Sequence, residues 1–348
     1  MAVINRIACF SDDMTAWRRH LHQHPELGTA CHDTADFVVD RLREFGITDI
    51  HRGFATTGLV ALIEGQGPGP TLGLRADMDG LPIEEASGVN WASTRPGKMH
   101  ACGHDTHIAI LMGVAEVLSK HKDKINGSIK FIFQPAEEGP PPGEEGGAKL
   151  MVKEGVLENP KVDAIYGLHI NSGTPVGTIT LKPEGIMAAV ERFVVTVKGK
   201  GSHGSAPWSG VDPILISAKI IDGFQTIISR EAYLIEAPAV ITVGKITSGT
   251  RFNVIPESAE LIGTVRTLNP DMRTMIIKRM TEMASDIAKA YGGNATIDWQ
   301  NNTIVTYNDP ELTTKAISTL KMVAGADKVL GMKAVTGGED FSYFQEKI

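Results

Sequence analysis

Residues 99–118 read MHACGHDTHIAILMGVAEVL, and this stretch joins a cluster of metal-binding residue types to an apolar helix. Its first nine residues hold one cysteine and three histidines, in a chain that has only 3 cysteines and 11 histidines. After Asp105 the apolar residues recur at the i, i+3, i+4, i+7 spacing of an amphipathic helix that ends near His121. They are Ile108, Leu111, Met112, Ala115 and Leu118. The stretch therefore predicts a helix that begins with sulfur and imidazole ligands.

Short apolar runs bounded by glycine and proline lie on both sides of this helix, as is typical of buried strands. They are residues 58–65, 71–77, 129–133 and 163–170. Two more helices are predicted before them, one with Ser11 or Asp12 as its N-cap and one over residues 33–45. Alternation of helices with buried strands indicates an α/β domain built on a doubly wound sheet.

The sequence changes character after the first half of the chain. Residues 191–200, ERFVVTVKGK, alternate apolar and polar side chains, as in a strand with one exposed face. A helix, two strands, a second helix and a last strand follow, and this β-α-β-β-α-β order is that of a ferredoxin-like unit. Because 348 residues exceed the usual size of one hydrophobic core, two domains are expected. We predict an inserted domain at residues 184–300 and a first domain formed by residues 1–183 and 301–348.

Composition argues against several classes of partner. A net charge of -7 gives no basic surface for nucleic acid. No apolar run approaches the roughly 20 residues of a membrane span, so no membrane partner is expected. The first residues lack the charged and apolar regions of a secretion signal, and 3 cysteines do not form a disulfide framework. These features predict a cytoplasmic protein that acts on a small molecule.

Polar motifs follow the predicted strands at the points where each strand ends. They are Asp77 and Asp79 in RADMD, Glu137 and Glu138 in QPAEEG, and His169 in GLHI, together with Cys102 and His104 in HACGHD before the helix. In an open α/β sheet, ligands bind beyond the carboxyl ends of the strands. We therefore expect these motifs to converge on one rim of the sheet.

Thiolate, imidazole and carboxylate together are typical ligands of Zn, Mn, Co and Ni, and a site with an open position is catalytic. Cys102 and His104, one residue apart, can face the same ion from an extended loop. Of the two adjacent glutamates, one can bind metal while the other moves a proton. Each residue alone has a plainer interpretation, because a glutamate pair after proline is often a solvated turn and a strand histidine such as His169 is often a core residue. His100 and His107 flank the cluster as candidates for orienting the ligands.

Eight segments of the chain, in order, resemble the signatures of the M20 metallopeptidase clan in its aminoacylase-type subfamily. They are WRRHLHQHPELG, LRADMDGLPI, MHACGHDTH, FQPAEEG, GLHI, GKGSHGSAPWSGVDP, RFNVIPESAELIGTVRT and GGEDFSYF. The subfamily includes hippurate hydrolases, N-acyl-amino-acid amidohydrolases, N-acetyl-diaminopimelate deacetylases and plant auxin-conjugate hydrolases. The resemblance implies a zinc-peptidase-like catalytic domain and an inserted lid that forms a homodimer or homotetramer.

The resemblance also implies a centre of two divalent ions, drawn from Mn, Zn, Co or Ni. The implied metal ligands are Cys102, His104, Glu138 and His169. The other implied site residues are Glu137 as general base, Asp77 as a residue that orients a ligand, and His203, Asn253 and Arg266 of the lid near the substrate. His203 is expected to stabilise the oxyanion in the neighbouring subunit. The implied reaction is metal-dependent hydrolysis of N-acyl amino acids of the hippurate or N-acetyl type, which releases a carboxylate and a free amino acid.

One family feature is absent from this sequence. Relatives have a fifth metal ligand, a histidine beyond the GGEDF motif, whereas no histidine follows His203 here. Either the sequence is a truncated part of a longer protein, or one metal site lacks a donor. Two rival hypotheses are therefore kept: an inactive metal-binding pseudoenzyme of the same family, and a hydrolase with Cys102 as nucleophile. The second rival leaves the glutamate pair and His169 without a role.

Overall fold

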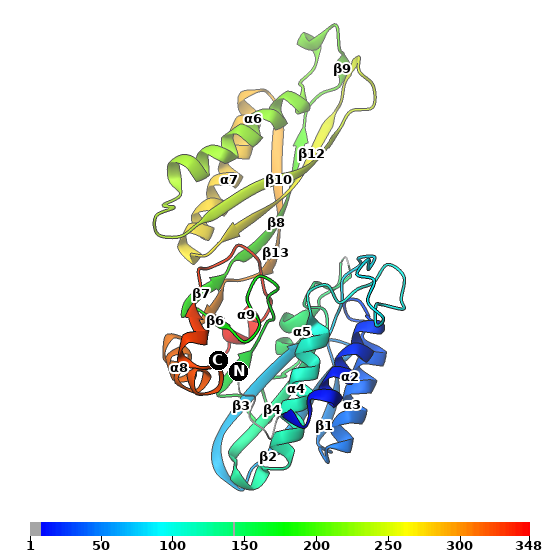
Figure 1. The fold of residues 1–348 in the computed structure, drawn as a ribbon. Coiled ribbons are helices and arrows are strands. Elements are labelled where there is room, and N and C mark those ends of the chain that lie inside the picture. Colours follow the sequence, from blue (N-terminus) through cyan, green and yellow to red (C-terminus); the bar gives the residue numbers. More distant parts are fainter. Residues whose placement is uncertain (1–7, 142) are drawn as a thin grey trace. The chain divides into compact units, whose positions relative to one another are not determined.

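The computed structural model describes residues 8–141 and 143–348, and the chain divides into two compact units (Figure 1). Unit 1 comprises Met1–Leu181, Thr314–Gly331 and Asp340–Ile348, and unit 2 comprises Lys182–Thr313 and Met332–Glu339. Unit 2 extends beyond the predicted insertion because its first strand pairs with residues after position 300. The roles of the two parts as catalytic domain and lid stay predictions.

Unit 1 is built on a five-stranded mixed sheet with the strand order β1-β2-β4-β3-β5. The strands are β1 (Ile50–Phe54), β2 (Gly58–Glu64), β3 (Gly67–Asp77), β4 (Asn126–Gln134) and β5 (Ala164–Gly167). β4 and β5 each pair in parallel with β3, whereas β2 is antiparallel to both β1 and β4. The carboxyl ends of β3, β4 and β5 therefore share one edge, as the α/β interpretation predicts.

The strands differ from the sequence-based expectation at one strand that was not predicted and at one that is shorter than expected, and β3 and β4 begin about four and three residues earlier than the predicted runs. β1 was not predicted, because its residues IHRGF are mostly polar and exposed. The run at residues 163–170 is only partly a strand, since β5 ends at Gly167. His169 consequently lies in the loop beyond the strand.

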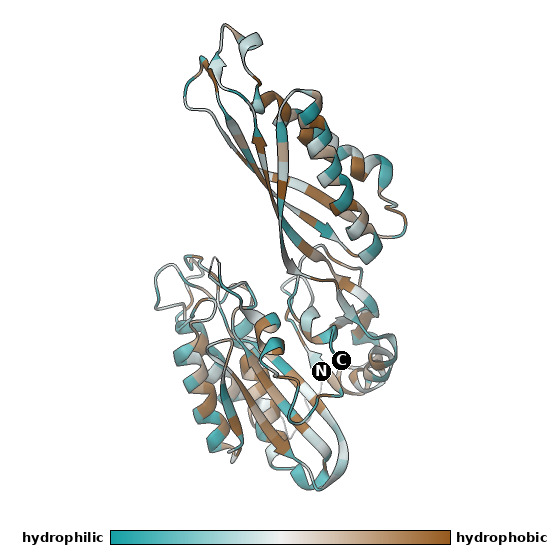
Figure 2. Cartoon of the chain, turned by 180° about the vertical axis from the view of Figure 1, so that it is seen from behind, coloured by the Kyte–Doolittle hydropathy of each residue, from teal (hydrophilic) through white to brown (hydrophobic). Residues whose placement is uncertain are grey.

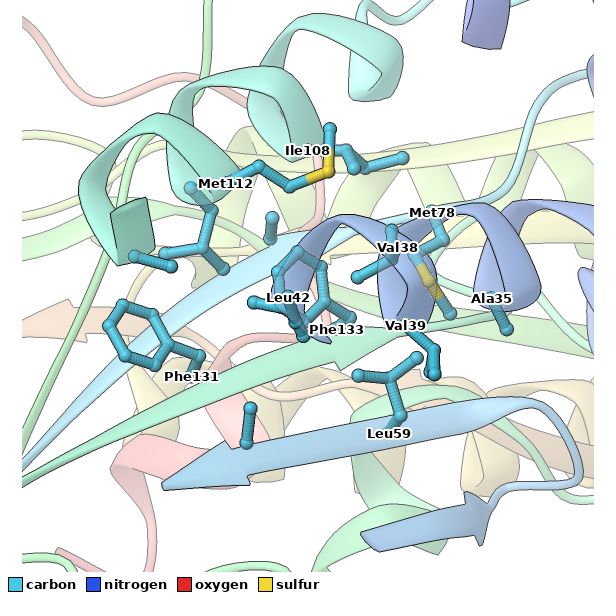
Figure 3. Close-up of a cluster of buried hydrophobic side chains, with 14 of the residues drawn as sticks. Ala35, Val38, Val39, Leu42, Leu59, Met78, Ile108, Met112, Phe131 and Phe133 are labelled. Carbon is cyan, nitrogen blue, oxygen red and sulfur yellow. The ribbon is translucent and has the colours of Figure 1, made fainter. Parts of the chain in front are cut away.

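Helices cover this sheet and supply its core. They are α2 (Ser11–Gln23), α3 (His32–Glu44), α4 (His104–Ser119), α5 (Gly147–Lys153) and α9 (Ser342–Gln345). A further helix, α8 (Pro310–Ala324), begins in unit 2 and ends in unit 1. Figure 3 shows apolar side chains of α3 and α4 over those of β2 and β4. Fully buried members such as Leu42, Met112 and Phe131 each contribute about 1.5–3 kcal/mol from burial. The helix predicted after Asp105 is confirmed and ends two residues earlier than expected, at Ser119.

Unit 2 contains a four-stranded antiparallel sheet with the order β10-β12-β8-β13. Its elements are β8 (Ala189–Lys198), α6 (Pro213–Thr226), β10 (Ala239–Ser248), β12 (Ser258–Thr267), α7 (Pro270–Ala290) and β13 (Asn294–Thr303). Both helices lie on one face of the sheet (Figure 1). The order of elements is β-α-β-β-α-β, so the ferredoxin-like arrangement is confirmed.

Three short strand pairs complete the described fold. They are β6 (Ile179–Leu181) with β15 (Val329–Gly331), β7 (Glu184–Met187) with β14 (Thr306–Asn308), and β9 (Ser202–His203) with β11 (Val254–Ile255). In Figure 2 the helices of both units carry bands of hydrophobic and hydrophilic residues, as expected where one face packs on a core. None of the helices in the described parts of the chain combines the length and hydrophobicity of a membrane-spanning segment.

Candidate metal centre

The loop before α4 carries two of the predicted ligands, since Cys102 precedes the helix and His104 opens it. Gly103 between them has φ 92°, a left-handed conformation that favours glycine. Sγ of Cys102 lies 3.4 Å from Nε2 of His169, which reaches the same point from the loop beyond β5. One ligand atom from each of Cys102, His104 and His169 lies within 4.8 Å of the others.

A second group of ligand atoms forms around the same imidazole. His104, Glu137 and Glu138 each place one ligand atom within 4.8 Å of the others, and Nε2 of His104 lies 3.8 Å from Oε2 of Glu137. His104 thus belongs to both groups. The structure therefore places the other three predicted ligands, Cys102, Glu138 and His169, around the ring of His104. That these residues bind metal stays a prediction.

The surroundings of His104 fit a cation. Its side chain is fully buried, and neither ring nitrogen makes a hydrogen bond within the described residues. The carboxylates of Asp77 and Asp79 lie 3.6 and 3.5 Å from Nε2 and Nδ1. Burial opposes a positive charge here, yet these carboxylates raise the pKa of His104 to about 12. A buried ring without hydrogen bonds among several carboxylates is the environment in which a divalent ion would supply the balancing charge.

The other predicted ligands have charge and exposure that suit a catalytic centre. The imidazoles of His104 and His169 lower the pKa of Cys102, which favours the metal-binding thiolate. Burial raises the pKa of Glu138, although its side chain still meets solvent. His169 is exposed as well, so the group opens on one side, as catalytic metal sites do.

Asp79 holds the glutamate pair in place, a role that the sequence analysis did not assign. Its Oδ1 and Oδ2 accept the backbone N–H groups of Glu137 and Glu138 at 3.0 and 3.1 Å. Asp79 is almost fully buried, and these contacts join the segment that follows β3 to the turn after β4. The signal in the sequence was the second aspartate of RADMD, two positions after Asp77.

Asp77 lies at the centre of a buried network. Its Oδ2 accepts a hydrogen bond from Nη1 of Arg75 at 2.7 Å, and its Oδ1 accepts one from Nδ1 of His107 at 2.6 Å. Burial favours the neutral acid, but the Arg75 guanidinium holds the pKa of Asp77 well below its usual range. Arg75 also donates to Gln134 at 2.8 Å and to Asp340 at 3.1 Å, so the GGEDF motif anchors this network.

The three predicted lid residues lie in unit 2. His203 is exposed on β9, and its Nδ1 accepts the backbone N–H of Ser205 at 3.1 Å. Asn253 is next to it, because its carbonyl accepts the N–H of Gly204 at 2.8 Å. Arg266 lies on another strand, β12, where burial lowers its pKa. Their predicted roles at the substrate stay predictions.

Comparison with known proteins identifies the family. The family model described as "Peptidase family M20/M25/M40" matches residues 73–348. Thermostable carboxypeptidase 2 of Saccharolobus solfataricus is 41% identical over 332 residues, covering 95% of this chain and 82% of that protein. N-acyl-L-amino acid amidohydrolase of Geobacillus stearothermophilus is 42% identical over 282 residues, covering 81% of this chain and 74% of that protein.

A solved structure agrees with these relatives. It is a Bacillus subtilis protein described as a dinuclear metal-binding peptidase of the M20 family, with a TM-score of 0.84 and 35% identity, covering 98% of this chain and 87% of that one. The chain therefore belongs to peptidase family M20/M25/M40, in its aminoacylase-type subfamily. It is an enzyme of the amidohydrolase type, and the predicted family and fold class are confirmed.

Proposed function

We propose that this enzyme hydrolyses the amide bond of N-acyl amino acids, of the hippurate or N-acetyl type, at a centre of two divalent ions. The observation that carries the proposal is the buried His104 ring, which makes no hydrogen bond within the described residues and has both ligand groups around it. Relatives named as amidohydrolase and deacetylases support the substrate class. Mn, Zn, Co and Ni all suit this donor set.

The protein groups around the centre have separate tasks. Cys102, His104, Glu138 and His169 would hold the ions. When bound, these ions would acidify a water molecule and polarise the amide carbonyl. Glu137 would take a proton from that water and pass it to the amino-acid nitrogen as the C–N bond breaks. The hydrogen bond from its backbone N–H to Asp79 holds the main chain of the proposed base near the end of β3.

His203 is the proposed oxyanion donor, supplied by the partner subunit of a homodimer or homotetramer. Because Nδ1 accepts the N–H of Ser205, the neutral ring carries its proton on Nε2. That N–H would donate to the oxyanion that forms when water attacks the carbonyl, a contact typically worth 10²–10³ in rate. Asn253 and Arg266 are proposed to contact the substrate.

A turnover screen tests the proposal. Purified protein is supplied with Mn or Co and offered hippurate, N-acetyl-amino acids and N-acetyl-diaminopimelate, and the released amino acid is measured. We expect turnover that stops with a chelator and returns with metal. Turnover that survives the chelator but is abolished by thiol alkylation would instead favour Cys102 as nucleophile. Metal binding without any turnover would favour the pseudoenzyme.

A further inference from the structure

Ile170 contacts two loops that carry proposed metal ligands, the loop of His169 and the loop of Cys102 and His104. It follows His169, and its backbone N–H donates to Nε2 of His107 at 2.9 Å. Its carbonyl lies 2.5 Å from Nδ1 of His169, which donates to it. Its side chain lies directly over Gly103, because a Cβ added at that glycine would stand 2.3 Å from Cδ1 of Ile170. One residue thus links the loop of His169 to the loop that carries Cys102 and His104.

The hydrogen bonds of His107 fix its tautomer. Nε2 accepts from Ile170, so the neutral ring carries its proton on Nδ1, which donates to Asp77 at 2.6 Å. Asp77 is in turn held by Arg75 at 2.7 Å. A continuous series of buried groups therefore runs from β3, through the first turn of α4, to the backbone beside His169.

The sheet does not hold His169 in this way. Parallel pairing between β3 and β5 ends at the Arg75–Gly167 pair, two positions before His169. The His169 side chain is exposed, and its ring packs edge-on against that of His107, with 4.7 Å between centroids. Contacts outside the sheet, with the backbone of Ile170 and the ring of His107, therefore have to direct Nε2 of His169 toward Cys102.

We propose that His107 is a positioning residue that presets His169 for metal through the N–H of Ile170. The inference rests on the metal centre of the proposed function. Groups that orient a ligand without touching the metal typically change metal affinity by 10–100-fold when they are replaced. A merely structural histidine would change the stability of the fold and leave the affinity for metal as it was.

Two variants separate the two hydrogen bonds of His107. In His107→Gln the side-chain oxygen can occupy the place of Nε2 and still accept the N–H of Ile170. In His107→Asn the amide can occupy the place of Nδ1 and reach Asp77, but it cannot reach Ile170. Both variants remove the same imidazole, so a shared folding defect cancels in the comparison. His121→Asn is the control, because His121 lies beyond the end of α4 at Ser119, more than three helical turns along the chain from His107.

The measurement is a titration of metal-free full-length protein with Co²⁺, followed by the thiolate-to-cobalt absorption and by elemental analysis. We expect His107→Asn to bind cobalt about 10–100-fold more weakly than the wild type, with His107→Gln close to the wild type and His121→Asn unchanged. Thermal melting of each metal-free variant monitors the fold.

Equal cobalt affinity and spectrum in the Asn and Gln variants would overturn the positioning role, with the proposed function intact if the wild type binds cobalt. A wild type that binds no cobalt would overturn the proposed function and this inference together.

Discussion

Asp77 and His104 in unit 1 are fully buried, whereas His203 in unit 2 is exposed and contacts Ser205, two positions along the chain. In unit 1, hydrogen bonds join residues that are distant in sequence, such as Asp79 to Glu138. The geometry around Asp77 and His104 therefore follows from the fold of unit 1. His203, in contrast, lies on the two-stranded pair of β9 and β11. Its proposed role therefore depends on the substrate that it contacts.

The largest expected effect concerns Glu137 in unit 1. Glu137→Gln replaces the carboxylate of the proposed base with an amide of the same shape. The hydrogen bond from the backbone N–H of residue 137 to Asp79 stays in place. We expect kcat to fall by about 10²–10⁴ on the best N-acyl amino acid, with unchanged metal content. Turnover assays and elemental analysis check this together. Retained turnover would remove Glu137 from its proposed role.

The next effect would sharpen the contrast between the units. His203→Asn is expected to lower kcat by about 10²–10³ while metal content stays constant and the free energy of unfolding changes by less than about 0.5 kcal/mol. His32→Asn, at another exposed histidine, serves as a control with normal kcat. If His203→Asn loses metal instead, the residue belongs to the centre itself and the contrast between the units is wrong.

A smaller effect is expected at Gly103. Gly103→Ala places a Cβ in a left-handed residue and against Ile170, so we expect metal affinity to fall about tenfold, or 1.4 kcal/mol. Gly97→Ala is a matched control, because Gly97 has φ 72° but nothing within 4 Å of the added Cβ. Both variants lose about 1–2 kcal/mol of stability from the left-handed backbone conformation. Equal metal affinity in the two would contradict the role of the Ile170 contact.

The smallest effect tests Asp79. Asp79→Asn keeps one oxygen acceptor but loses the charge that strengthens the bonds to Glu137 and Glu138. We expect the free energy of unfolding to fall by about 1 kcal/mol, the difference between charged and neutral hydrogen bonds. Urea denaturation of the metal-free protein measures it. No change in stability would show that these bonds contribute little to holding the pair.

The sequence could predict which strand ends carry the candidate site, because buried parallel strands have a recognisable composition and their carboxyl ends share an edge. It also predicted the helix that His104 opens. It could not predict that Arg75 meets Asp340, since those residues lie 265 positions apart and only the folded sheet brings them together.

Loop direction was equally beyond the sequence. His169 was expected at the end of a strand, but β5 stops at Gly167, and in the loop beyond it the backbone N–H of Ile170 donates to the side chain of His107. Local propensity carries no information about such contacts. Asp79 was visible as an acidic residue, yet its partners are backbone N–H groups, which have no signature in a sequence.

Metal content tests the central claim most directly. Full-length protein is freed of metal, equilibrated with Mn or Co, separated from loosely bound ions and analysed for metal per chain, beside the Cys102→Ser and His169→Asn variants. The account predicts two ions per chain in the wild type and a clear loss in each variant. A wild type that retains no ion, or variants that retain as much as the wild type, would contradict it.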